Sequence, residues 1–475
     1  MLFNSLQYLI FFPIVATTFF FTPHRYRWLL LLCASYYFYI SWKAEYALLL
    51  LGTTTITYMA AIAISHSSSK TIQQILLTVS LLTNFSVLIF FKYLTFFNKI
   101  LDTLLLLIQV PYEIRAPNVL LPIGISFYLF RTTSYLIDVY RNDLKPEKHF
   151  GIFSLYVSFF PSLLAGPIDR ATRLLPQFHQ KLRFDKSSIW TGLQLILLGF
   201  FKKVVIADRL SIYVDNVFNN ITYHKGFGCL LASFFYTIQI YCDFSGYSDI
   251  AIGCAAIMGF RLMTNFNNPY FATTIPDFWR RWHISLSTWF RDYVYIPLGG
   301  SRKGLPRTLA NFMITMLLCG LWHGASWTFV FWGGAHGLLL CLSKLTLSWR
   351  DRLSQQFALP SCLKTTVRII VTFNVVNLLW VFFRASSIQD AFSIIYNMLQ
   401  TFNTKPLNLD RIIALPNFLL ICGFVLILLI YEKFVLEGSS FLRNRYIKMI
   451  FFSFIFWSII IFGSFSNQAF IYFQF

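Results

Sequence analysis

The sequence predicts an all-α membrane protein that crosses the bilayer many times. Hydrophobic residues occupy 57% of the 475 positions and charged residues only 12%, whereas about 25% of a typical soluble domain is charged. A soluble fold of this composition would expose more apolar surface than soluble proteins tolerate. Several apolar runs also approach the roughly 20 residues that a membrane-spanning helix needs. These observations favour a polytopic membrane protein over a large soluble domain.

Residues 1–110 are predicted to form the N-terminal spans. Their apolar segments extend to Phe91, and Ile72–Phe91 is nearly free of charge. Met1–Tyr8 contains no basic residue, and no small-residue cleavage pattern follows the first apolar run. We therefore expect the first segment to remain as a span rather than to be removed as a signal peptide. The basic first loop, with Arg25 and Arg27, favours an outside N-terminus.

Residues 119–346 differ, because charges, prolines and glycines interrupt their apolar segments. Examples are YCDFSGYSDIAIG and LCGLWHGASWTFVFWGGAHG. Non-helical backbone and ionisable side chains at membrane depth are tolerated where they are buried in protein or line a wet cavity. We therefore expect this part to form a ring of tilted spans and re-entrant segments around a polar hollow.

Residues 347–465 return to ordinary spans, near Val367–Phe383, Ile412–Tyr431 and Ile447–Phe462. A short aromatic motif, 466–475, follows them and ends in FIYFQF. The length rule predicts about 11 to 13 transmembrane helices in all. We expect the 475 residues to form one integral membrane domain.

The net charge of +20 would favour a nucleic-acid partner in a soluble protein. Here the basic residues lie in short loops between spans, which is typical of cytoplasmic loops of membrane proteins, and no nucleic-acid-binding motif is present. The eight cysteines show no CxxC or Cys–His spacing. The sequence therefore predicts membrane lipids as partners, and neither a disulfide framework nor a zinc site.

Three histidines in the interrupted region are candidates for chemistry: His283, His323 and His336. A lone histidine among apolar residues is usually a hydrogen-bonded core group. His323 is the exception we favour, because an apolar run ends there beside Gly324. A neutral imidazole in a partly desolvated hollow is a suitable general base. A metal site built from the three histidines would need tertiary contacts, and HExxH-type spacing is absent, so no metal is predicted.

The stretch Arg280–Arg307 combines arginines with interleaved tryptophans. It is either a basic cytoplasmic face with interfacial aromatic side chains or a binding surface for an anionic donor, such as the phosphates of coenzyme A or an acidic carrier protein. Asp243 and Asp249 are six residues apart and do not share a helix face well, so we expect them to be structural or to support a neighbouring site rather than to form a catalytic pair. Candidates for substrate or donor binding are Arg280, Arg281, Trp282, Arg291, Asn268 and His336.

The stretch NNPYFATTIPDFWRRWHISLSTWFRDYVYIPLGGSRKG, followed by LCGLWHGASWTFVFWGGAHG, closely resembles the membrane-bound O-acyltransferase (MBOAT) family. It is most similar to the bacterial branch that O-acetylates alginate, peptidoglycan and other exported polysaccharides, and the resemblance covers essentially the whole chain. It implies a ring of helices around a central funnel, with residues 119–346 as the catalytic core. The family's invariant histidine corresponds to His323, its second motif histidine to His283, and a further histidine of the bacterial branch to His336.

The resemblance also implies a function. An acyl group, acetyl in the bacterial branch, would pass from a cytoplasmic thioester, either acetyl-CoA or an acyl carrier protein, across the bacterial inner membrane to a polysaccharide. A periplasmic or membrane-tethered partner O-acetyltransferase would complete the transfer, and no bound cofactor is expected. One alternative is a channel or transporter for a small solute or lipid, since broken helices suit that class too. Another is a eukaryotic-style lipid or protein acyltransferase of the same superfamily.

The motif FIYFQF places Tyr472 among phenylalanines. It is either an interfacial aromatic anchor or a carrier of the acyl group. In the related D-alanylation systems, a separate membrane peptide ends in a similar motif, and its tyrosine is taken to carry the acyl group. A phenol has a pKa near 10 and a thiol near 8.5, so an aryl ester keeps much of the transfer potential of a thioester. With His323 as base, the resemblance makes Tyr472 a candidate catalytic residue.

Overall fold

The computed structural model describes residues 1–109, 120–356, 360–400, 415–436, 438, 444–465 and 470–473. Within these ranges the regular structure is helical throughout and contains no strand, which confirms the predicted all-α class. Nine helical segments of the described residues are long and apolar enough to cross a membrane. This number is below the expected range of about 11 to 13, partly because helix α1 (Leu6–Phe21) is apolar but has only 16 residues.

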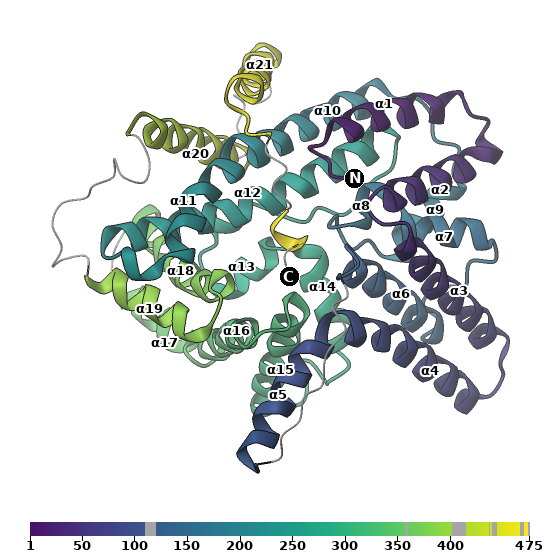
Figure 1. Ribbon diagram of the computed structural model, residues 1–475, viewed down its shortest axis with the longest axis horizontal. Coiled ribbons are helices and arrows are strands. Elements are labelled where there is room, and N and C mark those ends of the chain that lie inside the picture. Colours follow the sequence, from purple (N-terminus) through teal and green to yellow (C-terminus); the bar gives the residue numbers. More distant parts are fainter. Residues whose placement is uncertain are drawn as a thin grey trace. The chain divides into compact units, whose positions relative to one another are not determined.

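The chain divides into two compact units. The first contains Met1–Ile196 and Ile250–Met263 together with Tyr472, and the second contains Leu197–Asp249 and Thr264–Ile471. The helices that begin in the first unit (its α-helices are labelled in Figure 1) are α1, α2 (His24–Ile40), α3 (Glu45–His66), α4 (Lys70–Leu88), η1 (Ile89–Tyr93), α5 (Leu94–Leu107), α6 (Ile125–Tyr140), α7 (Phe150–Ser158), α8 (Phe160–Leu163), α9 (Ala171–His179) and α10 (Lys186–Phe200).

The second unit has more helices, and α12 passes from it into the first unit. The helices that begin in it are η2 (Phe201–Ala207), α11 (Asp208–Asn219), η3 (Ile221–Tyr223), α12 (Phe227–Ile257), η4 (Pro269–Phe271), α13 (Ile275–Arg281), α14 (Ile284–Phe290), η5 (Arg291–Tyr295), α15 (Leu305–His323), α16 (Trp327–Leu345), α17 (Leu347–Gln356), α18 (Ser361–Arg384), α19 (Ile388–Leu399), α20 (Leu415–Leu436), α21 (Arg445–Phe462) and, at the C-terminal motif, η9 (Ile471–Phe473), which continues into the first unit at Tyr472.

In the first unit, α3 packs against α4, α6 and α7. The fully buried Arg131 of α6 donates hydrogen bonds to three backbone carbonyls in the segment from the end of α7 to the GPIDR stretch, those of Val157, Ser162 and Pro167. The next turn is held by Asp169, whose Oδ1 accepts the Met263 N–H at 3.0 Å. Burial raises the pKa of Asp169 to about 6. A buried arginine thus supports the non-helical backbone that the prolines and glycine of this stretch produce.

In the second unit, α15 and α16 form a tightly packed antiparallel pair (Figure 1). Glycines make the close approach possible. A Cβ atom on Gly320 would lie 2.3 Å from the Phe329 carbonyl oxygen, and one on Gly333 would lie 2.3 Å from the Met316 carbonyl oxygen. Small residues at such crossings let membrane helices pack backbone to backbone. The pair is joined by a short turn in which the Ser326 side chain accepts the Thr328 N–H and caps α16.

The π-helix η2 interrupts a long apolar segment and carries two consecutive buried lysines. Lys202 pairs with Asp249 at 2.9 Å and approaches Glu432 at 3.7 Å. Lys203 pairs with Asp208 at 2.9 Å and with Asp243. Charges buried at membrane depth are costly unless they are paired. Each of the two aspartates of α12, Asp243 and Asp249, thus neutralises one lysine, which is a structural role.

Candidate active site

His323 is the last residue of α15, at the point where the apolar run was expected to break. It is 4% exposed. Its ring lies against Trp332 of α16 and Phe383 of α18, with centroid distances of 5.2 Å to each. The helix ends because Gly324 takes an extended conformation, and any side chain there would overlap the Phe329 ring. The close α15–α16 crossing therefore places an imidazole at the end of a helix inside an aromatic enclosure.

His283 lies between the short helices α13 and α14 and is fully buried. Its backbone is left-handed, with φ of 42°, a conformation that few residues other than glycine adopt. Its ring packs edge-on against Phe244 at 4.6 Å, and its centroid is 6.5 Å from that of His323. Burial lowers the pKa of His283 well below its ordinary value, so the ring is neutral at physiological pH. The structure thus brings two of the predicted histidines together.

Asn265 holds the strained turn at His283. Its side-chain oxygen accepts the Ser285 hydroxyl at 2.9 Å, its backbone oxygen accepts the Ile284 N–H at 2.8 Å, and its amide donates to Ser248 at 3.0 Å. These bonds tie the start of α14 to α12. Sequence reasoning did not single out Asn265, because its partners are 17 to 20 residues away and no local pattern marks them.

His336 lies in α16, four residues after Trp332, and is fully buried. The Trp279 indole donates to its Nδ1 at 3.3 Å. The Trp332 ring touches both histidines, with centroids 5.2 Å from His323 and 4.8 Å from His336. His336 therefore stands behind a tryptophan that separates it from His323. Among the residues that the structure describes, no group of three metal-ligating side chains is arranged to hold a metal ion.

The predicted donor-binding residues do not share one environment. Arg280 and Arg291 are exposed, and Arg291 pairs with the neighbouring Asp292 at 2.8 Å. Arg281 is half-buried and pairs with Asp277 at 3.0 Å. Trp282 and Asn268 are structural in their contacts: Trp282 is fully buried in an aromatic cluster that includes Trp380, and the Asn268 amide donates to the Glu432 carbonyl.

The C-terminal motif is described at 470–473, and residues 466–469 and 474–475 lie outside the described residues. Phe470 is 1% exposed and packs edge-on against Tyr247 at 4.4 Å. The Ile471 N–H donates to Oδ2 of Asp243 at 2.8 Å. Tyr472 follows in a single 3₁₀ turn and is half-buried. The segment just before the predicted carrier tyrosine is thus held inside the second unit.

The region that contains the three histidines is also the region in which this chain matches a known protein family. A model of the membrane-bound O-acyltransferase family matches residues 149–388, which contain all three histidines. The chain is 40% identical over 415 residues to the probable alginate O-acetylase AlgI of Pseudomonas aeruginosa, covering 86% of this chain and 76% of that protein. The chain belongs to the membrane-bound O-acyltransferase family.

Two further relatives of this MBOAT protein are named for other acceptors, peptidoglycan and teichoic acid. The peptidoglycan O-acetyltransferase of Helicobacter pylori is 36% identical over 397 residues, covering 78% of this chain and 73% of that protein. The teichoic acid D-alanyltransferase of Bacillus subtilis is 30% identical over 269 residues, covering 54% and 67%. This MBOAT protein is therefore a multi-pass membrane O-acyltransferase, and the comparisons favour the enzyme over the channel or transporter considered from sequence.

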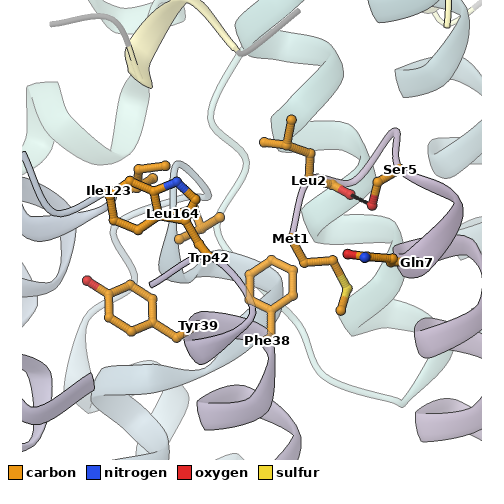
Figure 2. Close-up of a pocket in the computed structure, with 9 residues that line it drawn as sticks. All are labelled: Met1, Leu2, Ser5, Gln7, Phe38, Tyr39, Trp42, Ile123 and Leu164. Carbon is orange, nitrogen blue, oxygen red and sulfur yellow. Dashed lines mark hydrogen bonds between the residues drawn. The ribbon is translucent and has the colours of Figure 1, made fainter. Parts of the chain in front are cut away.

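The first unit of this MBOAT protein has a cavity of about 220 Å³ (Figure 2). Its wall is mainly apolar and comes from the N-terminal residues, the end of α2 and two residues near α6 and α8. Two of the lining residues are bonded to each other, since the Ser5 hydroxyl donates to the Leu2 carbonyl at 2.7 Å. The lining residues are Met1, Leu2, Ser5, Gln7, Phe38, Tyr39, Trp42, Ile123 and Leu164.

Proposed function

We propose that this protein moves an acetyl group from a cytoplasmic thioester across a bacterial inner membrane for the O-acetylation of an exported or cell-surface polysaccharide. The names of the relatives support this proposal, because relatives that match most of the chain are named as an alginate O-acetylase and a peptidoglycan O-acetyltransferase. The donor is acetyl-CoA or an acyl carrier protein, and a periplasmic or membrane-tethered O-acetyltransferase is the partner that completes the transfer.

The single observation that carries the proposal is the pairing of two buried histidines at broken helix ends. His323 ends α15, His283 precedes α14, and their ring centroids are 6.5 Å apart. Aromatic rings enclose both imidazoles, so a reacting group beside them is shielded from bulk water. In such surroundings a neutral imidazole takes a proton from a hydroxyl without competition from solvent. We assign His323 as general base and His283 as the residue that shapes the donor site.

The proposed first step makes an ester at Tyr472. His323 accepts the phenol proton while the phenol oxygen attacks the thioester carbonyl of the donor. The carbon–sulfur bond breaks, and the leaving thiolate takes the proton from the imidazolium. In the second step, a hydroxyl of the partner transferase or of the polysaccharide attacks the acetyl-tyrosine and releases the phenol. The order of the steps follows acidity, since a thiol, a phenol and a sugar hydroxyl are progressively weaker acids.

The exposed arginines of the α13–η5 segment are the proposed contact for the donor. Arg280 and Arg291 present guanidinium groups to solvent, and guanidinium groups bind phosphates in two-point geometry. The phosphates of coenzyme A, or the phosphopantetheine arm and acidic face of a carrier protein, fit such a surface. Arg281 pairs with Asp277 and is half-buried, so it shapes the same face, whereas Arg291 stays exposed although it pairs with Asp292.

The test of the proposed base is His323→Ala in reconstituted vesicles supplied with radiolabelled acetyl-CoA and, in a parallel assay, with acetylated carrier protein. Loss of general-base catalysis predicts a rate lower by about 100-fold or more. The matched control is His66→Ala, which removes an exposed histidine at the end of α3. A His323→Ala protein that transfers label as fast as the control would overturn the assignment of the base.

The carrier role of Tyr472 is tested separately. The variant Tyr472→Phe keeps the ring but cannot form an ester, so we expect it to abolish transfer to the acceptor. Mass spectrometry of the C-terminal peptide after incubation with donor should show an added acetyl group in the parent protein and none in the variant. Undiminished acetylation of the product by Tyr472→Phe would end the carrier proposal and leave His323 untouched.

A further inference from the structure

The C-terminal motif is connected to the interior of the second unit by three specific contacts. The Phe470 ring lies edge-on against Tyr247, and the Lys203 ammonium is 4.4 Å from its centroid. The Ile471 N–H donates to Asp243 Oδ2 at 2.8 Å. All of the side chains involved are nearly inaccessible to solvent. A segment far from η2 and α12 in sequence is therefore built into their buried ionic cluster.

The Lys202 and Lys203 clusters of η2 differ in the groups that bond to their carboxylates, and this difference bears on the contact with Ile471. In the Lys202 cluster, the ammonium pairs with the side chains of Asp249 and Glu432, and the Tyr241 hydroxyl donates to Glu432. In the Lys203 cluster, Asp243 divides its two oxygens. Oδ1 pairs with Lys203, and Oδ2 accepts the backbone N–H of the C-terminal motif.

A buried carboxylate oxygen is costly without a donor, and a hydrogen bond to a charged acceptor is stronger than one between neutral groups. The Ile471 N–H supplies that donor, and the Phe470 ring covers the Lys203 ammonium through a cation–π contact. The C-terminal motif therefore stabilises both charged groups of the Asp243–Lys203 pair from within the cluster, rather than only covering its surface.

We propose that Lys203, Asp243 and Tyr247 form a peptide-binding socket that recognises an aromatic residue followed by a backbone N–H and so positions Tyr472. The positioning role rests on the carrier function proposed above, whereas the socket itself does not. The Cα atoms of consecutive residues are about 3.8 Å apart, so fixing the Ile471 N–H confines Tyr472 to a small volume. Asp243 is thus a positioning residue that acts through the backbone.

The experiment is hydrogen–deuterium exchange of the full-length protein in detergent, read from overlapping peptides that contain Ile471. The substitution Asp243→Asn removes the charge of the acceptor, and we expect exchange at the Ile471 amide to rise by about tenfold or more, as for loss of a hydrogen bond to a charged group. Its matched control is Asp249→Asn, which makes the same change in the neighbouring lysine cluster and should leave exchange at Ile471 as in the parent.

A second variant keeps the test decisive if Asp243→Asn does not fold. Phe470→Ala leaves the ion pairs in place but empties the aromatic part of the socket, and it should raise exchange at Ile471 as well. Phe465→Ala, at an exposed position, is its control. Unchanged exchange in folded Phe470→Ala protein would refute the socket, as would unchanged exchange in folded Asp243→Asn protein.

The same proteins separate the socket from the carrier function. Tyr472→Phe should leave exchange at Ile471 unchanged while abolishing acetyl transfer. Asp243→Asn should lower kcat for acetyl transfer more than it raises KM for the donor, because donor binding does not involve the motif. If Tyr472→Phe remains active while Asp243→Asn and Phe470→Ala loosen the motif, the socket stands and the carrier role fails.

Discussion

The close approach of α15 and α16 yields a sharp prediction for Gly333→Ala. A Cβ atom at this position would lie 2.3 Å from the Met316 carbonyl oxygen, whereas ordinary contact begins at 3.4 Å. The obstacle is backbone, so it cannot rotate aside, and the two helices must separate by about 1 Å. Trp332, which precedes Gly333, lies against His323. The substitution therefore moves the proposed base relative to the aromatic side chains that hold it.

The expected effect of this substitution is on rate. A displacement of about 1 Å at a catalytic group lowers the rate by about 100-fold. Alanine is otherwise the better residue in a helix, by about 1 kcal/mol over glycine, so any loss arises from the crossing and not from helix propensity. The assay is the initial rate of acetyl transfer in reconstituted vesicles, with thermal unfolding measured on the same preparations.

Gly334→Ala is the matched control, because its Cβ would meet only the flexible end of Leu317 at 3.4 Å. This variant should retain the parent rate. If Gly333→Ala gave a rate within about twofold of Gly334→Ala, the helix crossing would not set the position of His323, and the reasoning would be refuted.

Two further predictions concern the first unit. Arg131→Met removes the donors that reach three buried carbonyls, and it should lower the free energy of unfolding by about 3 kcal/mol or more, measured by thermal unfolding in detergent. The control is Arg141→Met, at an exposed position. If Arg131→Met lowered stability no more than this control, the supporting role of Arg131 would be contradicted. Burial raises the pKa of Asp169 to about 6, so the folded state holds the proton of this carboxyl group more tightly than the unfolded state does. The stabilising contribution of the protonated group is therefore full below about pH 4 and is lost as pH rises to about 6. Asp169→Asn should remove this dependence, on the order of 3 kcal/mol, and equal slopes of unfolding temperature against pH in both proteins would exclude it.

The features that local sequence patterns predicted are the all-α class and the position of His323 at a helix end. Both depend on short-range signals: uninterrupted apolar runs indicate helices, and the glycine after His323 indicates where one stops. The span count was harder to predict, because charges and glycines that interrupt a run do not reveal whether the helix continues. The segment 70–107, for example, is one continuous helical span that includes a π turn.

The interior ion pairs could not be read from sequence. Lys202 and Lys203 follow an apolar run and look like the basic end of a span, yet both are buried. Asp208, which pairs with Lys203, is close in sequence, but the other partners are 40 or more residues away in α12, or much further in α20, and only the folded chain brings them together. The left-handed turn at His283 was hidden for the same reason, since Asn265 supports it from a different segment.

The paired lysines of η2 also bear on how the chain enters the bilayer. Each lysine near the centre of a span opposes insertion by about 2.5 to 3.5 kcal/mol, so the segment 186–219 is a poor substrate for the translocon on its own. Asp208, in the same segment, already pairs with Lys203, but the aspartate that pairs with Lys202 and the second partner of Lys203 arrive only with α12, the next long helix to be synthesised. We therefore expect the two segments to leave the translocon together as a hairpin, with their charges already matched, rather than one after the other.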